Sequence, residues 1–166
     1  MHAEYPTIYR DQRGEEHTTI RNDGKVLTTT IRGVQFSGAD FDALEPEAGC
    51  DPDALRSFTL NQNELCACVI ETTMPMPIWN NGVVAEAELR VRLELGEPAP
   101  NGGIDREVMT LTLVIEGQTI TTKKGHGHFE DALLEIQRQL PDETHMMACI
   151  NCAYPHHSPY GSALFG

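Results

Sequence analysis

The stretch Val84-Ala-Glu-Ala-Glu-Leu-Arg-Val-Arg-Leu-Glu-Leu95 decides the fold. Apolar side chains occupy every second position from Ala85 to Leu95, and glutamate or arginine fills the positions between Ala85 and Leu95. Because successive side chains of a β-strand point to opposite faces, this alternation predicts a strand with one face in the core and one in water. On the wet face, alternating opposite charges predict pairs with neighbouring strands rather than a catalytic pair of carboxylates.

Further strands are predicted on both sides of this stretch. Asp23-Gly24 stands between two β-rich runs and indicates a hairpin, because the turn needs a positive φ that these residues tolerate. The segment 33–41 is expected to continue the strand that ends at Ile31 and to turn at Gly38.

The segment Met74-Pro-Met-Pro-Ile-Trp79 contains two prolines. Because proline has no backbone N–H to donate to a neighbouring strand, the sequence predicts that this segment is not a central strand. Trp79 is the only tryptophan, and we expect it to pack in the core. The alternative is that it rims a pocket beside the turn Asn80-Asn81-Gly82.

One helix is predicted over residues 128–141. Phe129, Ala132, Leu133, Ile136 and Leu140 form a single apolar stripe at helical spacing, and Pro141 is expected to end the helix. A stripe of this kind packs on a sheet. The sequence therefore predicts a mainly β (α+β) fold, either an antiparallel β-sandwich or a curved sheet of about eight strands, with one C-terminal amphipathic helix.

By length the 166 residues predict a single domain, 1–166. Its parts are a β-meander over 1–45, antiparallel strands over 57–123, the helix, and a tail over 145–166 that contains cysteine and histidine. No apolar run reaches the roughly 20 residues that span a bilayer, and the first residues lack the pattern of a signal peptide. We therefore expect a soluble, cytoplasmic protein.

The formal net charge is −13, from 12 basic and 25 acidic residues. Such a balance repels phosphate backbones and anionic lipid surfaces, so neither nucleic acid nor a membrane is an expected partner. The acidic residues are scattered along the chain, which is typical of a surface that serves solubility. The alternative is an acidic face that binds a basic protein.

The tail carries the densest group of metal-ligand side chains. Cys149-Ile-Asn-Cys152 has the CxxC spacing that directs two thiolates at one ion, and His156 and His157 follow it closely. Cys66 and Cys68 lie two apart in a predicted strand, so they are expected on one side of it. A structural zinc site would use either the four cysteines or the tail alone.

Two other interpretations of these cysteines stay open. Reduced thiols without any ligand behave as small hydrophobic side chains. A redox pair or regulatory disulfide is the other, although a thioredoxin-like motif would place CxxC at the start of a helix rather than after one. The nearby His126-Gly-His128 is expected to form a loop with His128 near the helix cap.

Several C-terminal motifs carry a resemblance to a known family. They are the helix from Phe129 to Pro141, the CxxC motif, Ser158-Pro-Tyr-Gly161 and Phe165-Gly166. Together these resemble an uncharacterised family of small bacterial proteins, many of them actinobacterial, with no assigned activity. The family tends to have Phe-Ser-Asp-Tyr where this sequence has Tyr154-Pro-His-His, so a ligand set built on His156 and His157 would be particular to this chain.

No motif of an established enzyme class occurs in the sequence, which makes a non-catalytic function the first hypothesis. We expect a small acidic binding or interaction module with a structural zinc site and a protein partner. One alternative is a small metal-dependent or thiol-redox enzyme. A second is an immunity-like protein that binds a basic effector.

Overall fold

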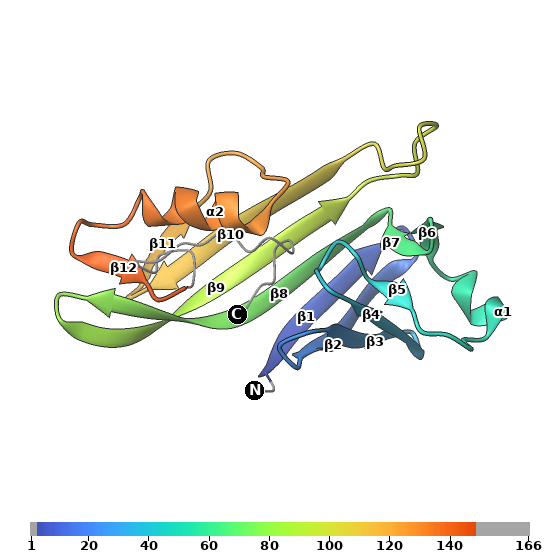
Figure 1. The fold of residues 1–166 in the computed structure, drawn as a ribbon, viewed down its shortest axis with the longest axis horizontal. Helices are drawn as coiled ribbons and strands as arrows, with labels where there is room; N and C mark the ends of the chain where they lie inside the picture. Colours follow the sequence, from blue (N-terminus) through green and yellow to red (C-terminus); the bar gives the residue numbers. More distant parts are fainter. Residues whose placement is uncertain (1–2, 149–166) are drawn as a thin grey trace.

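The computed structural model describes residues 3–148 of the chain. Within this range a ten-stranded antiparallel sheet dominates, as Figure 1 shows, and a two-stranded hairpin and two helices accompany it. The main sheet consists of β1 (Ala3–Asp11), β2 (Gly14–Asn22), β3 (Leu27–Ile31), β4 (Val34–Gly38), β5 (Glu45–Pro46), β8 (Cys68–Asn80), β9 (Val83–Leu95), β10 (Glu107–Ile115), β11 (Gln118–Thr121) and β12 (Thr144–Met146). The remaining elements are α1 (Pro52–Leu55), the hairpin of β6 (Thr59–Asn61) and β7 (Glu64–Cys66), and α2 (Phe129–Gln137).

The strand order is β11-β10-β9-β8-β1-β2-β3-β4-β5, with β12 added beside β8. The longest strands, β8 and β9, form a hairpin that pairs over all 13 residues of each and runs along the whole molecule (Figure 1). On its other edge β8 pairs with β1 up to Thr72, and with β12 from Ile78 onward. The predicted mainly β fold is confirmed, as a single curved sheet rather than a sandwich.

The prediction that prolines exclude 74–79 from a central strand was wrong, because Pro75 and Pro77 lie inside β8. The Pro77 carbonyl accepts a hydrogen bond from the Met147 N–H, so Pro77 turns its backbone polar groups away from β9. Pro75, two residues earlier, turns the same way. This part of the β8 edge lies between the last pair with β1 and the first pair with β12, where no ladder of the described residues needs a donor.

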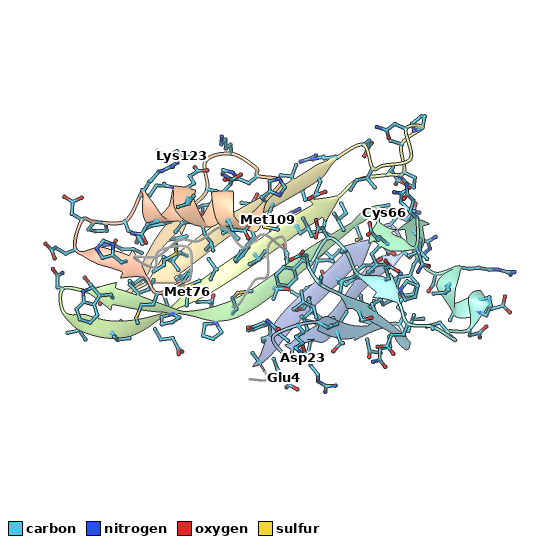
Figure 2. All side chains as sticks on the ribbon, in the orientation of Figure 1. Glu4, Asp23, Cys66, Met76, Met109 and Lys123 are labelled. Atoms are coloured by element: carbon cyan, nitrogen blue, oxygen red, sulfur yellow. The ribbon has the colours of Figure 1, made fainter. Side chains whose placement is uncertain are left out.

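One face of the sheet is covered at both of its ends. At one end α2 packs Phe129, Ala132 and Ile136 onto β10, and Met109 lies beneath the helix (Figure 2). At the other end the segment 41–66 covers β1 to β4, where the Phe58 ring packs edge-on against Tyr9 and Phe36. The buried side chains of both ends belong to one continuous core.

Several local predictions need correction. Arg32 and Gly33 form the tight turn of a β3–β4 hairpin, with φ of 50° and 77°, so the segment from Gly33 reverses the preceding strand instead of continuing it. The helix ends at Gln137, before Pro141, because the next residues form tighter turns: the Gln139 N–H donates to the Ile136 carbonyl.

No helix within 3–148 is long and apolar enough to cross a membrane.

Candidate functional site

The face of the sheet opposite α2 is uncovered by any described element, and we call it the open face. It follows from strand alternation: the glutamates and arginines of β9 from Glu86 to Glu94, which were predicted to face water, lie on it, and their cross-strand partners lie beside them. Its central residues are Ile8 and Arg10 of β1; Val69, Glu71, Thr73, Pro75, Pro77 and Trp79 of β8; Val84, Glu86, Glu88, Arg90, Arg92 and Glu94 of β9; and Val108, Thr110, Thr112 and Val114 of β10.

At one end of the open face apolar side chains are exposed to solvent. Trp79 is 43% exposed and lies opposite Val84, which is 55% exposed, at the tip of the β8–β9 hairpin. Met147, 52% exposed, follows β12 and donates its N–H to β8 beside them. The expectation that Trp79 packs in the core was therefore wrong. A large aromatic group left in water next to other apolar groups is typical of a contact surface.

The middle of the open face carries the predicted cross-strand charge pairs. Glu71 of β8 contacts Arg10 of β1 on one side and Arg92 of β9 on the other, the latter at 3.4 Å. Arg92 also reaches Glu94 of its own strand at 3.0 Å. These pairs are exposed or half-buried, so each contributes little stability, and their main effect is to fix a pattern of charge on the surface.

Between these charges the open face is hollowed. A cavity of about 620 Å³ lies over β2, β1, β8, β9 and β10, with Glu71, Arg90 and Arg92 at its charged wall and threonines over much of the rest. The last β1–β8 rung is Thr7 with Thr72, whose hydroxyls are 3.0 Å apart. Beyond this rung β1 and β8 no longer pair, so the two strands separate and the face is interrupted there.

The predicted metal ligands fall into two groups. Cys149, Cys152, His156 and His157 lie outside the described residues. Cys66 and Cys68 are described and buried, but they do not share one strand, because Ala67 between them has a φ of 50° and separates β7 from β8. Figure 2 shows Cys66 at the end of the molecule away from α2. Their same-side placement through strand alternation was therefore wrong.

Burial also governs the chemistry of these two thiols. It raises the pKa of Cys68 to about 12, with the neighbouring Cys66 adding to the effect, and it raises the pKa of Cys66 as well. Both groups are therefore neutral thiols at neutral pH. Within residues 3–148 no three side chains of histidine, cysteine, aspartate or glutamate are arranged to hold a metal ion. The zinc site stays a prediction that depends on the tail.

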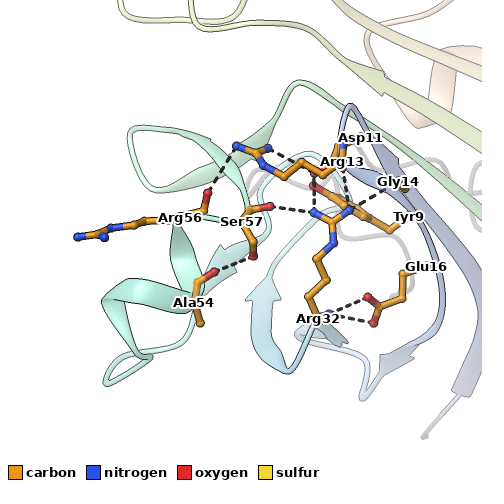
Figure 3. Close-up of polar contacts among 9 residues, drawn as sticks. All are labelled: Tyr9, Asp11, Arg13, Gly14, Glu16, Arg32, Ala54, Arg56 and Ser57. Carbon is orange, nitrogen blue, oxygen red and sulfur yellow. Dashed lines mark hydrogen bonds and ion pairs between the residues drawn. The ribbon is translucent and has the colours of Figure 1, made fainter.

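A dense polar cluster surrounds Arg32 at the end of the covered face (Figure 3). Its guanidinium donates two hydrogen bonds of 2.7 Å to Asp11 and another of 2.8 Å to the Ser57 carbonyl, and it lies over the Tyr9 ring. Its backbone N–H donates to Glu16. Burial alone would raise the pKa of Asp11, but Arg32 and the Arg13 N–H outweigh it and lower that pKa to about 2. This cluster is a structural tie between β1, the β3–β4 turn and the segment after α1.

Carboxylates gather where the loop after β4 meets the N-terminus of α2, and we call this group the acidic rim. It consists of Asp40, Asp42, Glu45, Glu64 and Glu107. Burial and the charge of Asp42 raise the pKa of Asp40. Burial also raises the pKa of Glu64, and Glu45 adds to the effect. No cation of the described residues makes an ion pair with the acidic rim, so the negative charges of its carboxylates repel one another.

The two histidines before α2 take different positions. His128 is the cap residue of the helix, as predicted, but its side chain makes no capping hydrogen bond. His126 forms a half-buried pair with Glu135 of the helix, and Glu135 also accepts the Lys123 N–H. His126 and that N–H lower the pKa of Glu135. The pair fastens the loop to the helix.

The sequence did not single out the open face as a site, nor the contact between Asp11 and Arg32. Exposure of Trp79 follows from its place at a hairpin tip, which the turn Asn80-Asn81-Gly82 beside it could have indicated. No local pattern connects Asp11 with Arg32, because their contact depends on how two separate hairpin turns meet.

Fold and surface together define a β-rich protein in which one long antiparallel sheet buries one face and presents the other. The chain belongs to a family of unknown function, DUF6304, whose model matches residues 3–155. This agrees with the resemblance to an uncharacterised family that the C-terminal motifs indicated. No curated protein and no solved structure matches the chain.

Proposed function

We propose that the protein is a non-catalytic binding module that docks another folded protein on its open face. The observation that carries the proposal is the exposed apolar group of Trp79, Val84 and Met147 next to a patterned, hollowed charged surface. Protein contact surfaces combine an aromatic anchor with charges that select the partner and fix its register. The proposed partner therefore presents a broad surface with complementary charges and an apolar group that contacts Trp79.

The experiment is site-specific photo-crosslinking in native cells. The photoreactive residue replaces Thr73 or Val84 on the open face, or, as controls, Lys25 or Asp142 elsewhere on the exposed surface. We expect a protein adduct of one defined mass from the open-face positions alone. The adduct should weaken when Arg90 and Arg92 are both replaced by glutamate, and it should survive Arg56→Glu with Arg138→Glu, which changes the net charge equally. Equal adducts from all positions, or none from the open face, contradict the proposal.

The structural zinc site is retained as part of the proposal, on the strength of the tail sequence. Metal analysis of protein purified without a histidine tag is expected to give about one zinc per chain, the stoichiometry of a four-ligand site. Substoichiometric zinc, with stability unchanged by chelation, would reject it. A cytoplasmic location, a bacterial and largely actinobacterial family, the enzyme alternative and the immunity-like alternative remain predictions from the sequence.

A further inference from the structure

The order of charges along β9 suits a second copy of the same chain. On the open face this strand reads Glu86, Glu88, Arg90, Arg92, two acids followed by two bases, and Glu94 comes after them. When two such strands lie face to face and antiparallel, Glu88 meets Arg90 and Glu86 meets Arg92, and each contact occurs twice by symmetry. A self-complementary order of this kind is what a two-fold symmetric interface requires.

This charge register fixes the rest of the contact. The two-fold axis crosses β9 at Leu89 and β8 at Met74, which are paired residues. Five residues further along β8 is Trp79, so it meets Val69 of the second copy, five residues before Met74. Met147 lies beside Pro77 on the flank of β8 that β1 shares. It therefore meets Ile8 of the second copy, because Ile8 pairs with Glu71 on that flank.

Trp79 and Met147 thus lie against the half-buried apolar side chains Val69 and Ile8 in the register that the charges select, whereas Val84 meets Glu94 of the second copy. The charges alone fixed the register, so this second match is an independent argument for it. In this register β8 and β9 overlap their counterparts over about 11 residues each, β10 overlaps over about five, and β1 faces β12 and Met147 over about six. At about 3.4 Å per residue and about 4.8 Å per strand, this is about 540 Å² per copy. The two copies together bury about 1,080 Å², just above the roughly 1,000 Å² expected of a biological interface.

We infer that the open face is the interface of a two-fold symmetric homodimer, with the sheets stacked antiparallel about Leu89 and Met74. This inference rests on the proposed function, since it names the partner that the open face docks. The paired glutamates and arginines set the register, and Trp79 and Met147 supply the apolar contact. Charged pairs at such an interface weaken as salt screens them, so dimerisation is expected to be salt-sensitive.

The test is a set of charge reversals followed by analytical ultracentrifugation from about 1 to about 100 µM chain. Arg90→Glu with Arg92→Glu makes every charge of the β9 row acidic, and Glu86→Arg with Glu88→Arg makes the four charges from position 86 to position 92 basic while Glu94 stays acidic. Each variant alone is expected to raise the dissociation constant at least about 100-fold, because like charges then face each other. An equimolar mixture of the two is expected to form a heterodimer, which also shows that both variants are folded. The control Arg56→Glu with Arg138→Glu should dimerise like the wild type.

Several results would overturn the inference. A wild type that stays monomeric at the highest concentration removes the homodimer, and a mixture that fails to associate removes the register. A monomer that dimerises only after truncation behind Ala148 shows that the following segment of the chain occupies the face instead. The photo-crosslinking adduct separates these failures from that of the proposed function: an adduct heavier by another protein's mass keeps the module and discards the second copy.

Discussion

Replacing Asp11 by asparagine is the sharpest test of how β1, the β3–β4 turn and the segment after α1 are held together. The Asp11 carboxylate is 2% exposed and makes a two-bonded contact with Arg32, whose side chain is 20% exposed. The fall of the Asp11 pKa from its ordinary 3.8 to about 2 corresponds to about 2.4 kcal/mol of stability, at about 1.36 kcal/mol per pH unit. Asparagine keeps the shape and removes this charge.

At pH 7 we therefore expect Asp11→Asn to lower the free energy of unfolding by about 2 to 3 kcal/mol, or the melting temperature by about 5 to 10 °C. The folded-state pKa is depressed, so the contribution is complete above about pH 5 and is lost as the pH falls through 4 towards 2. Urea unfolding at a series of pH values measures both effects. Asp53→Asn, which removes an exposed carboxylate, is the control and should change stability by less than about 0.5 kcal/mol. A loss below about 0.5 kcal/mol in the Asp11 variant, or an unchanged acid limb, would refute the reasoning.

Three further predictions concern other parts of the fold. Asp40→Asn should stabilise the protein at pH 7 by up to about 1 kcal/mol, because the pKa of Asp40 is raised and its charge therefore opposes folding at neutral pH. Thermal unfolding measures this change, and the control Asp142→Asn should have no such effect. With a chelator present, Cys66 and Cys68 should be alkylated at least about ten-fold more slowly than Cys50, because both are buried and their pKa is raised. Peptide mass spectrometry follows the alkylation, and similar rates for all three thiols would contradict the prediction. Gly38→Ala should lower the free energy of unfolding by about 2 kcal/mol or more, since its new Cβ would lie 2.1 Å from the Ala43 carbonyl oxygen. In the control Gly127→Ala the new Cβ meets no other atom, so urea unfolding should show no change in stability.

The regular parts of the fold could be predicted from the sequence because their patterns are local. The alternation in β9 and the apolar stripe of α2 each report which side faces the core, and both predictions agree with the structure. The predicted count of about eight strands fell short because β5, β6, β7 and β12 have only two or three residues each, too few to show any alternation.

Predictions failed where the outcome depends on distant neighbours. Whether prolines are tolerated in β8 depends on which strand lies beside each backbone nitrogen. Only the assembled sheet shows that β1 stops pairing with β8 before Pro75 and that β12 begins to pair with it after Pro77. In the same way the CxC segment was expected to be one strand, but Ala67 donates its N–H to the Gly96 carbonyl from a left-handed conformation. Local sequence carries no signal for either partner.

The prolines of β8 also bear on why the open face can exist at all. A stretch of central strand without a neighbour presents backbone groups that recruit strands of other chains, and this leads to aggregation. Pro75 and Pro77 remove two N–H donors from that stretch, and the Pro77 carbonyl already accepts the Met147 N–H, so an added strand would find the Pro75 carbonyl without a matching donor. The prolines therefore disfavour the insertion of a strand from another chain between β1 and β8. Association is then left to the side chains of the open face, whose order of charges, unlike a bare strand edge, distinguishes one partner from another.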